Sequence, residues 1–361
     1  MEIAHPHSIK KFELIEAYVK VWSQKLLNNP GCDGIVFIDC MSNSGVYQDE
    51  DGNTVFGTPI RVANYLSNVM KNYPQKQAKL YFNDISSEKI EELKTHLPSD
   101  TSNFSIITSV LDGNDLLREF KFESSKYCYL VVYDPYQASI DWFALMPFIK
   151  RWGDVIVNHM VSDPIRAITQ VKKPSTISKY ELTYLSSIQQ LAQFNSDREA
   201  YEKKVHDIMN SLRGNGKNTR YYIASFPFFN SCNAIVYKLM LGTANLEGFK
   251  TFKKVAWKTF GGKSSGKKTR GNKDQLMIDV DDMTVTTSPA DENCYYPKDI
   301  ANYLHKLFIG QENVPLKNVW AALDEHLIFP SDGFRNEVRE CLKTTFGDKV
   351  TRTSISFTGK K

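Results

Sequence analysis

The sequence predicts an α/β fold in which a mostly parallel sheet is covered by helices on both faces. The apolar run at residues 35–39 ends in Asp39 and enters a small polar turn that closes at Gly45. Two later apolar runs end in the same way, at Asp84 and at Asp134. Such uninterrupted runs are typical of strands buried on both faces. Because helix-like segments separate the three runs, they indicate a parallel sheet with helical crossovers.

The first helix is predicted over residues 8–27, with Ser8 as its N-cap and one apolar face formed by Phe12, Ile15, Val19, Trp22 and Leu26. Thr58 is expected to cap a second helix, with Pro59 at its first position. Ser86 or Ser87 should cap a third. Further helices are expected at residues 116–120, 142–152 and 249–260.

The remaining strands are predicted at residues 79–82, 104–107, 127–133 and 154–159. Residues 161–220 lose this strand character and are polar and helix-prone, so we expect a helical insertion that shapes or covers the mouth of the site. The sheet is expected to resume at residues 221–225 and 234–240.

Composition places few limits on function. The chain has 361 residues, a net charge of +4 and 42% hydrophobic residues, which is ordinary for a globular protein. Its six cysteines form no C-x-x-C pair, which argues against a zinc ribbon, an iron–sulfur cluster or a disulfide framework. With no signal-like or membrane-spanning run, we expect a cytoplasmic protein with no membrane partner and no metal site.

The turn after the first strand is a candidate ligand cradle. Ligands of open α/β sheets bind at the carboxyl ends of the strands, and small residues let backbone N–H groups approach them. Asp39, Ser42, Asn43 and Gly45 are therefore candidate cofactor-binding residues.

Two further carboxylates follow the next strands. Asp84 is placed to accept hydrogen bonds from both hydroxyls of a ribose, and Asp112 to contact an adenine ring. Each has a plainer alternative, because an acidic residue after a strand often caps the next helix and Asp112-Gly113 is a favourable turn. Together they favour a nucleoside-bearing cofactor. The absence of a G-x-G-x-x-G turn points to S-adenosylmethionine rather than NAD.

Asp134-Pro135-Tyr136 is the candidate catalytic motif. A carboxylate and a Pro carbonyl can hold an exocyclic NH₂, and an aromatic ring can stack on a base. Catalysis would then consist largely of positioning. The alternative is an ordinary Asp-Pro turn with a packed tyrosine. Asn158 and His159 end the neighbouring strand and either line the same pocket or cap a helix.

At these residues the chain resembles the three-Cys-motif partner proteins, a family of methyltransferase-like proteins often encoded beside a radical-SAM-like protein that bears three cysteines. The resemblance spans nearly the whole chain and is carried by the opening helix with Lys11, Leu14 and Tyr18, by Phe37-Ile38-Asp39 with Gly45 and Tyr47, and by Gly57-Thr58-Pro59, Asp134-Pro135-Tyr136, Val157-Asn158 and the C-terminal helices. It implies a Rossmann-like methyltransferase fold that binds S-adenosylmethionine.

Two features depart from the family pattern. The family usually has a small-Gly-Pro-Gly turn where this chain has Ser42-Asn43-Ser44-Gly45. Because Asn tolerates a left-handed backbone, the turn can still form. Compared with the glycine-rich turn of the family, it is less favourable for close approach to the methionine part of the cofactor. Asp-Pro-Tyr also lacks the second Pro of the amino-methyltransferases that act on DNA.

The domain organisation follows from these assignments. We expect a methyltransferase-like domain at residues 1–260 and a basic flexible loop and linker at 261–296. Three helical stripes and a β-prone tail at 297–361 predict a winged-helix-like module, which would either read nucleic acid or dock a protein.

The predicted function is an S-adenosylmethionine-dependent methyltransferase whose acceptor is a nucleobase nitrogen in DNA or RNA. The alternative from another class is a non-catalytic scaffold for the radical-SAM-like three-cysteine protein. An NAD-dependent oxidoreductase is disfavoured, and small-molecule and protein acceptors remain open.

Overall fold

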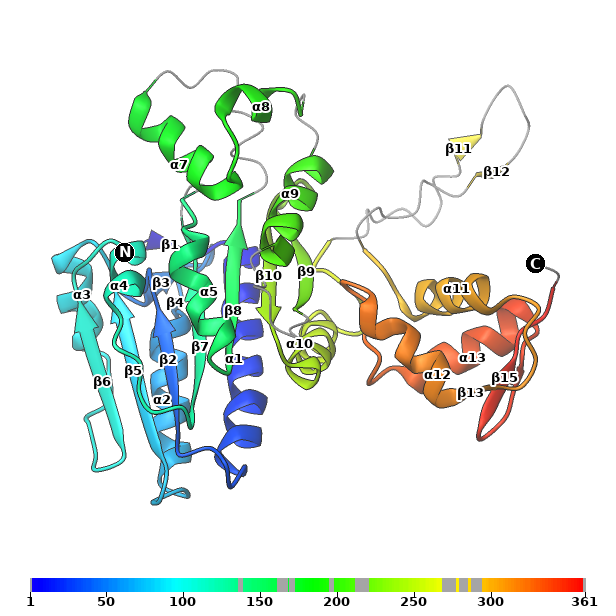
Figure 1. The fold of residues 1–361 in the computed structure, drawn as a ribbon, viewed down its shortest axis with the longest axis horizontal. Helices are drawn as coiled ribbons and strands as arrows, with labels where there is room; N and C mark the ends of the chain where they lie inside the picture. The colour runs from blue at the N-terminus through cyan, green and yellow to red at the C-terminus, as the bar shows by residue number, and fades with distance from the viewer. Residues whose placement is uncertain are drawn as a thin grey trace.

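The computed structural model describes residues 2–135, 139–160, 168, 173–194, 198–211, 221–267, 277–278, 285–286 and 294–359. In these residues the central sheet has seven strands in the order β6-β5-β2-β7-β8-β10-β9 (Figure 1). The strands are β2 (Gly34–Asp39), β5 (Gln77–Asn83), β6 (Phe104–Ser109), β7 (Tyr127–Tyr133), β8 (Gly153–His159), β9 (Tyr222–Phe229) and β10 (Ile235–Thr243).

The strand directions define the fold. β2 is the third strand of this order and pairs in parallel with β5 and β7, so that Asp39 is opposite Phe82 on one side and Val132 on the other. β10 runs antiparallel to both β8 and β9. Counted in chain order within this sheet, the strands lie 3-2-1-4-5-7-6 with the seventh reversed. This is the Rossmann-like methyltransferase arrangement, and it confirms the predicted α/β fold class.

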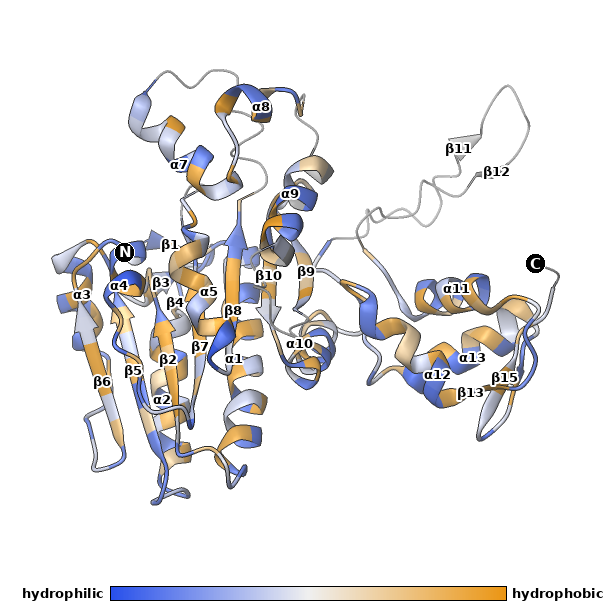
Figure 2. Ribbon diagram, in the orientation of Figure 1, coloured by the Kyte–Doolittle hydropathy of each residue, from blue (hydrophilic) through white to orange (hydrophobic). Residues whose placement is uncertain are grey.

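Two helical layers cover the sheet. One face packs against α1 (Pro6–Leu27), α2 (Thr58–Met70), α3 (Ser87–Lys94) and α10 (Leu246–Thr259). The other packs against α4 (Gly113–Glu119), α5 (Trp142–Lys150) and α9 (Arg198–Ser211). Because side chains alternate along a strand, Phe37 joins the first core and Ile38 the second. The central strands are accordingly apolar along most of their length (Figure 2).

The helix starts differ in detail from the predictions. α1 begins at Pro6 with His5 at the N-cap, so the expected Ser8 cap is wrong. Proline suits the first helical turn because its missing N–H has no partner there anyway. Gly57, not Thr58, is the N-cap of α2. The third prediction is confirmed, since the Ser86 side chain accepts a hydrogen bond from the Lys89 N–H.

The predicted insertion contains α7 (Pro174–Tyr184), α8 (Ile188–Ala192) and α9. α7 and α8 lie beyond the carboxyl ends of the parallel strands (Figure 1). The Tyr184 hydroxyl is 3.0 Å from Nε2 of His159 at the end of β8. In contrast, Val205 and Met209 of α9 belong to the core on the sheet. Part of this segment is therefore a sheet-covering crossover helix.

Three smaller units complete the described chain. β1 (Glu2–Ile3), β3 (Val46–Gln48) and β4 (Thr54–Phe56) form one sheet, and β11 (Met277–Ile278) pairs with β12 (Val285–Thr286). The C-terminal unit contains α11 (Pro297–Phe308), β13 (Val314–Pro315), α12 (Leu316–Ala321), the 3₁₀ helix η1 (Ala322–Glu325), α13 (Arg335–Phe346), β14 (Lys349–Val350) and β15 (Ser354–Ser356). It lies beside α10, away from the central sheet (Figure 1). No described helix is long and apolar enough to span a membrane.

Candidate functional site

The loops after the parallel strands meet at one edge of the sheet, where such folds bind ligands. Asn83 at the end of β5 ties three of them together. Its Nδ2 donates to the carbonyls of Cys40 at 3.0 Å and Leu111 at 2.9 Å, and its Oδ1 accepts from the Leu111 N–H at 3.0 Å. This fully buried amide fixes the relative positions of the loops that follow β2, β5 and β6.

The turn after β2 forms without the usual glycines. Asn43 takes the left-handed backbone with φ of 55°, and Gly45 has φ of 71°. A Cβ on Gly45 would lie within 2.9–3.0 Å of side-chain atoms of Leu93 and Ile60, so only glycine fits there. The expectation that Asn preserves the left-handed turn is confirmed.

This turn is largely bonded to its own chain. The Asn43 N–H donates to Asp84 Oδ2 at 3.0 Å, and the Met41 N–H donates to Asp39 Oδ1 at 3.2 Å. Glu2 of β1 lies over the turn and accepts a hydrogen bond from Asn43 Nδ2 at 2.7 Å. The loop is therefore a rigid, covered wall rather than an open row of N–H donors for a phosphate.

The two candidate nucleoside contacts lie beside exposed apolar side chains. Asp84 is 6% exposed, and its carboxylate accepts hydrogen bonds from two backbone N–H groups. The neighbouring Ile85 is 75% exposed, and Val110 and Leu111, next to Asp112, are 46% and 37% exposed. Asp112 itself caps α4 by accepting from the Asn114 N–H. The plainer role of Asp112 is thus present, and the two residues that precede it in the sequence, Val110 and Leu111, are exposed apolar side chains.

A cavity of about 240 Å³ opens beside the carboxyl end of β7 and is lined in part by Asp134, Pro135 and Asn158. We call it the acceptor cavity. The Asp134 carboxylate is ion-paired with the Lys11 ammonium through Oδ2 and accepts from Asn158 Nδ2 through Oδ1. Lys11 Nζ also lies 5.2 Å from the Tyr237 ring centroid. Neither Asp84 nor Asp112 is among the residues that line this cavity.

Asn158 contributes one further group to this cavity. Its side chain is 4% exposed, and its Oδ1 has no hydrogen-bond partner among the residues that the structure describes. The amide orientation is fixed, because Nδ2 must face the Asp134 carboxylate. A buried acceptor without a partner costs free energy, so this oxygen is suited to a ligand that donates an N–H or O–H.

Asp39 lies under the same region and is fully enclosed. Burial and repulsion from the nearby Asp134 carboxylate raise the pKa of Asp39 to about 7, and the Lys11 ammonium opposes the shift only partly. A cationic ligand beside these carboxylates would favour the ionised form of Asp39.

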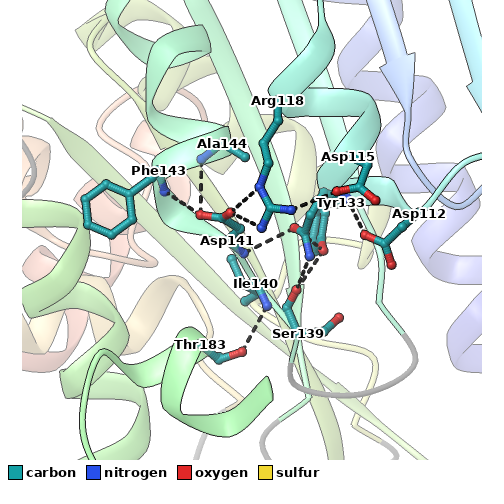
Figure 3. A network of polar contacts seen from close by, with 11 residues as sticks. Asp112, Asp115, Arg118, Tyr133, Ser139, Ile140, Asp141, Phe143, Ala144 and Thr183 are labelled. Carbon is teal, nitrogen blue, oxygen red and sulfur yellow. Dashed lines mark hydrogen bonds and ion pairs between the residues drawn. The ribbon is translucent and has the colours of Figure 1, made fainter. Parts of the chain in front are cut away.

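A polar network joins the end of β7 to Ser139 and Asp141 before α5 (Figure 3). Asn114 Oδ1 accepts from the Tyr133 hydroxyl at 2.7 Å and from the Asp141 N–H at 3.2 Å, and its Nδ2 donates to the Ser139 carbonyl at 3.0 Å. Arg118 pairs with Asp141, with Nε at 2.9 Å from Oδ2. Asn114 and Arg118 of α4 are therefore joined both to the end of β7 and to the residues that begin α5.

The structure brings together a site that the sequence indicated only in part. Tyr136 lies outside the described residues, so its predicted stacking role stays a prediction. Lys11 and Asn158 were noted in the sequence, but not as partners of Asp134. Ile85 was missed, although an apolar residue directly after a strand-end carboxylate was a signal that could have identified it.

No family model and no curated protein matches this chain. Solved structures resemble it remotely. Protein LPL1258 from Legionella pneumophila, of family model DUF519, is 11% identical, with 70% of this chain and 91% of that chain covered and a TM-score of 0.42. The O-methyltransferase TomG from Streptomyces achromogenes, solved with S-adenosylmethionine, is 11% identical (63% and 78% covered, TM-score 0.34). An rRNA methylase from Streptococcus thermophilus is 9% identical (62% and 96% covered, TM-score 0.27). The strand order, rather than these remote likenesses, defines the fold.

Proposed function

We propose that the protein is an S-adenosylmethionine-dependent methyltransferase that modifies an exocyclic amine of a nucleobase in DNA or RNA. The observation that carries this proposal is the buried Asn158 Oδ1, which has no partner among the described residues, on a side chain that lines the acceptor cavity next to Asp134. A primary amine has two N–H donors, and Asn158 Oδ1 and the Asp134 carboxylate are two acceptors for them.

The cofactor residues fit this proposal. Asp84 keeps acceptor capacity for a ribose hydroxyl, because a carboxylate can accept about four hydrogen bonds. Ile85 and Val110 offer apolar contact to an adenine, and Asp112 offers a carboxylate at its edge. Asp39 would face the positive end of the cofactor. When bound, S-adenosylmethionine supplies the electrophilic methyl group.

The chain's own residues then position the acceptor. Lys11 binds one oxygen of the Asp134 carboxylate and Asn158 binds the other, and these two contacts fix the orientation of the carboxylate. Asp134 and the Pro135 carbonyl orient the amine nitrogen, and Asp134 can take the proton that the nitrogen loses on methylation. Tyr136 is proposed to stack on the base.

The first experiment is calorimetric titration with S-adenosylhomocysteine. We expect micromolar binding that is weakened at least tenfold by Asp84→Asn and by Ile85→Asp, because these changes remove a carboxylate and an apolar contact from the proposed nucleoside site. Asp134→Asn should leave the affinity within about twofold. Equal losses in Asp134→Asn and Asp84→Asn would contradict the assignment of roles.

The second experiment measures transfer of labelled methyl groups to oligonucleotides. Asn158→Ala should lower kcat/KM about 10- to 100-fold, which corresponds to the roughly 1–3 kcal/mol of one lost hydrogen bond in a buried site. Its affinity for S-adenosylhomocysteine should not change. If the variant transfers methyl groups as well as the parent, Asn158 does not hold the acceptor.

One observation favours the alternative, a non-catalytic scaffold for a radical-SAM-like three-cysteine protein. The turn at residues 42–45 is bonded to its own chain and covered by Glu2. Absence of any heat with S-adenosylhomocysteine, in protein with intact circular dichroism, would support that alternative. Membership of the three-Cys-motif partner family stays a prediction. So does the winged-helix-like role of the C-terminal unit, which its order of helices and strands supports.

A further inference from the structure

A second cavity lies directly beside the acceptor cavity. It has a volume of about 270 Å³, and aromatic rings from three elements line it: His5 and His7 before and in α1, Phe228 and Phe229 of β9, and Phe260 after α10. The rings of His5 and His7 stack with centroids 5.6 Å apart and planes inclined by 18°. We call it the aromatic cavity.

The two cavities share one wall. His7 lines both of them, and its ring centroid is 5.8 Å from that of Tyr237, which lines the acceptor cavity with Asp134. Tyr237 also stacks on Phe228 of the aromatic cavity, with centroids 5.0 Å apart and an interplanar angle of 24°. The two cavities are therefore linked through His7 and through the buried rings of Tyr237 and Phe228.

Cationic side chains border the aromatic cavity. Lys267 Nζ lies 5.8 Å from the ring centroid of Phe229, and Lys10 belongs to the cavity wall. Carboxylates lie there as well: Lys10 is ion-paired with Glu13 at 2.6 Å, and Glu50 is 3.3 Å from His5 Nδ1. Aromatic faces next to lysines match the chemistry of a stacked base with its phosphate, whereas a purely apolar ligand would gain nothing from the ammonium groups.

We propose that the aromatic cavity binds a nucleobase that neighbours the methylated one in a single-stranded polynucleotide, with the linking phosphate at Lys10 and Lys267. This proposal rests on the proposed function and specifies its substrate. Duplex is excluded as the direct ligand because a base must leave its stack before rings of the protein can cover it. The protein would then require an unpaired segment longer than one nucleotide.

The test uses the full chain, with and without an excess of S-adenosylhomocysteine, and fluorescein-labelled 12-mers of single-stranded RNA, single-stranded DNA and the corresponding duplexes. Fluorescence anisotropy gives Kd as a function of salt. Phe229→Ala is the main variant, since Phe229 packs with Ile235 outside the two large cores. Lys267→Ala tests the phosphate contact. Trp152→Ala and Lys25→Ala are matched controls, because both residues line a separate cavity at the amino end of β8.

We expect one or both single strands to bind at least tenfold more tightly than duplex. Phe229→Ala should weaken this binding about 10- to 100-fold. Lys267→Ala should reduce the slope of log Kd against log salt by about 0.7. Equal binding of duplex, or equal losses in Phe229→Ala and Trp152→Ala, would overturn the proposal. The RNA and DNA arms show which backbone is bound.

Failure of this inference can be told apart from failure of the proposed function. If S-adenosylhomocysteine binds but no single strand does, the polynucleotide inference is wrong and the cofactor proposal stands. If single strands bind through Phe229 while S-adenosylhomocysteine gives no heat, the inference about the cavity holds and the methyltransferase proposal fails.

Discussion

At the scale of single residues, the main feature is the buried carboxylate of Asp39, which lies near the carboxylate of Asp134. Asp39 is 3% exposed at the end of β2, and burial together with the charge of Asp134 raises its pKa to about 7. In the unfolded chain this carboxyl has its ordinary pKa of 3.8, so it is protonated only below about pH 4. Between these values the folded state binds more protons, so its stability falls as pH rises.

Asp39→Asn should therefore stabilise the protein in a pH-dependent way. An amide carries no charge, so the variant avoids the free-energy cost of ionising a buried group above pH 7, and Asn Oδ1 can still accept from the Met41 N–H. We expect a gain of roughly 1–3 kcal/mol in the free energy of unfolding at pH 8 and little change at pH 4. Urea unfolding at both pH values measures it. The same gain at pH 4 and pH 8 would contradict a titration effect.

At the scale of elements, one side chain links three parts of the site. Asn114 at the start of α4 bonds to Tyr133 at the end of β7 and to Ser139 and Asp141 before α5 (Figure 3). Asp141 in turn caps α5 by accepting from the Phe143 N–H at 2.9 Å. One amide thus joins a strand, a loop and two helices.

Asn114→Ala should destabilise the fold by roughly 2–4 kcal/mol, because it leaves several buried donors and acceptors without partners. Asp115→Ala is the matched control on the same helix: Asp115 is half exposed and, in the described part of the chain, forms an ion pair with Arg118 at 2.8 Å, so the change should cost under about 0.5 kcal/mol. Chemical unfolding of the two variants, followed by tryptophan fluorescence, gives both values. Similar costs for both would show that the Asn114 hydrogen bonds do not stabilise the fold.

At the scale of the whole molecule, the C-terminal unit is joined to the sheet domain through α10. The ammonium of Lys253 is fully buried and donates to the carbonyls of Leu323 at 2.8 Å and His326 at 2.9 Å. Trp257 Nε1 donates to the Ile328 carbonyl at 3.0 Å. Apolar residues of both parts belong to one continuous core. The predicted division at residue 260 stays a prediction, but the two parts share buried contacts.

This joint should respond to pH. Burial lowers the pKa of Lys253 to about 7 from its ordinary 10.5, and the nearby Lys250 adds to the shift. Between pH 7 and 10.5 the unfolded chain binds the proton that the folded chain lacks, so stability should rise with pH by up to about 1.4 kcal/mol per unit. Lys253→Met lacks this titration.

The measurement is the free energy of unfolding at pH 7 and pH 9 for the parent and for Lys253→Met. We expect the variant to be less stable at pH 9, because two carbonyls lose their donor, and to show a much smaller gain between the two pH values. The control is Lys258→Met on the same helix. Among the described contacts, the Lys258 side chain forms no hydrogen bond or ion pair with the C-terminal unit, so this variant should keep the parent's dependence of stability on pH. Identical slopes in all three proteins would rule out Lys253 as the titrating group.

The sequence by itself determined the sheet. Strands such as residues 127–133 are apolar on both faces, and only burial between two helical layers satisfies that pattern. It also placed Asp39, Asp84, Asp112 and Asp134 at strand ends, because strand limits follow from local composition.

Only the tertiary structure decided which side chains meet at those ends. Lys11 reaches Asp134 across 123 positions of the chain, and Asn158 lies 24 positions beyond it. Such contacts depend on strand order and helix placement, which local patterns do not encode. The aromatic cavity is a tertiary feature for the same reason: its rings come from α1, β9 and the end of α10, and packing alone brings them together.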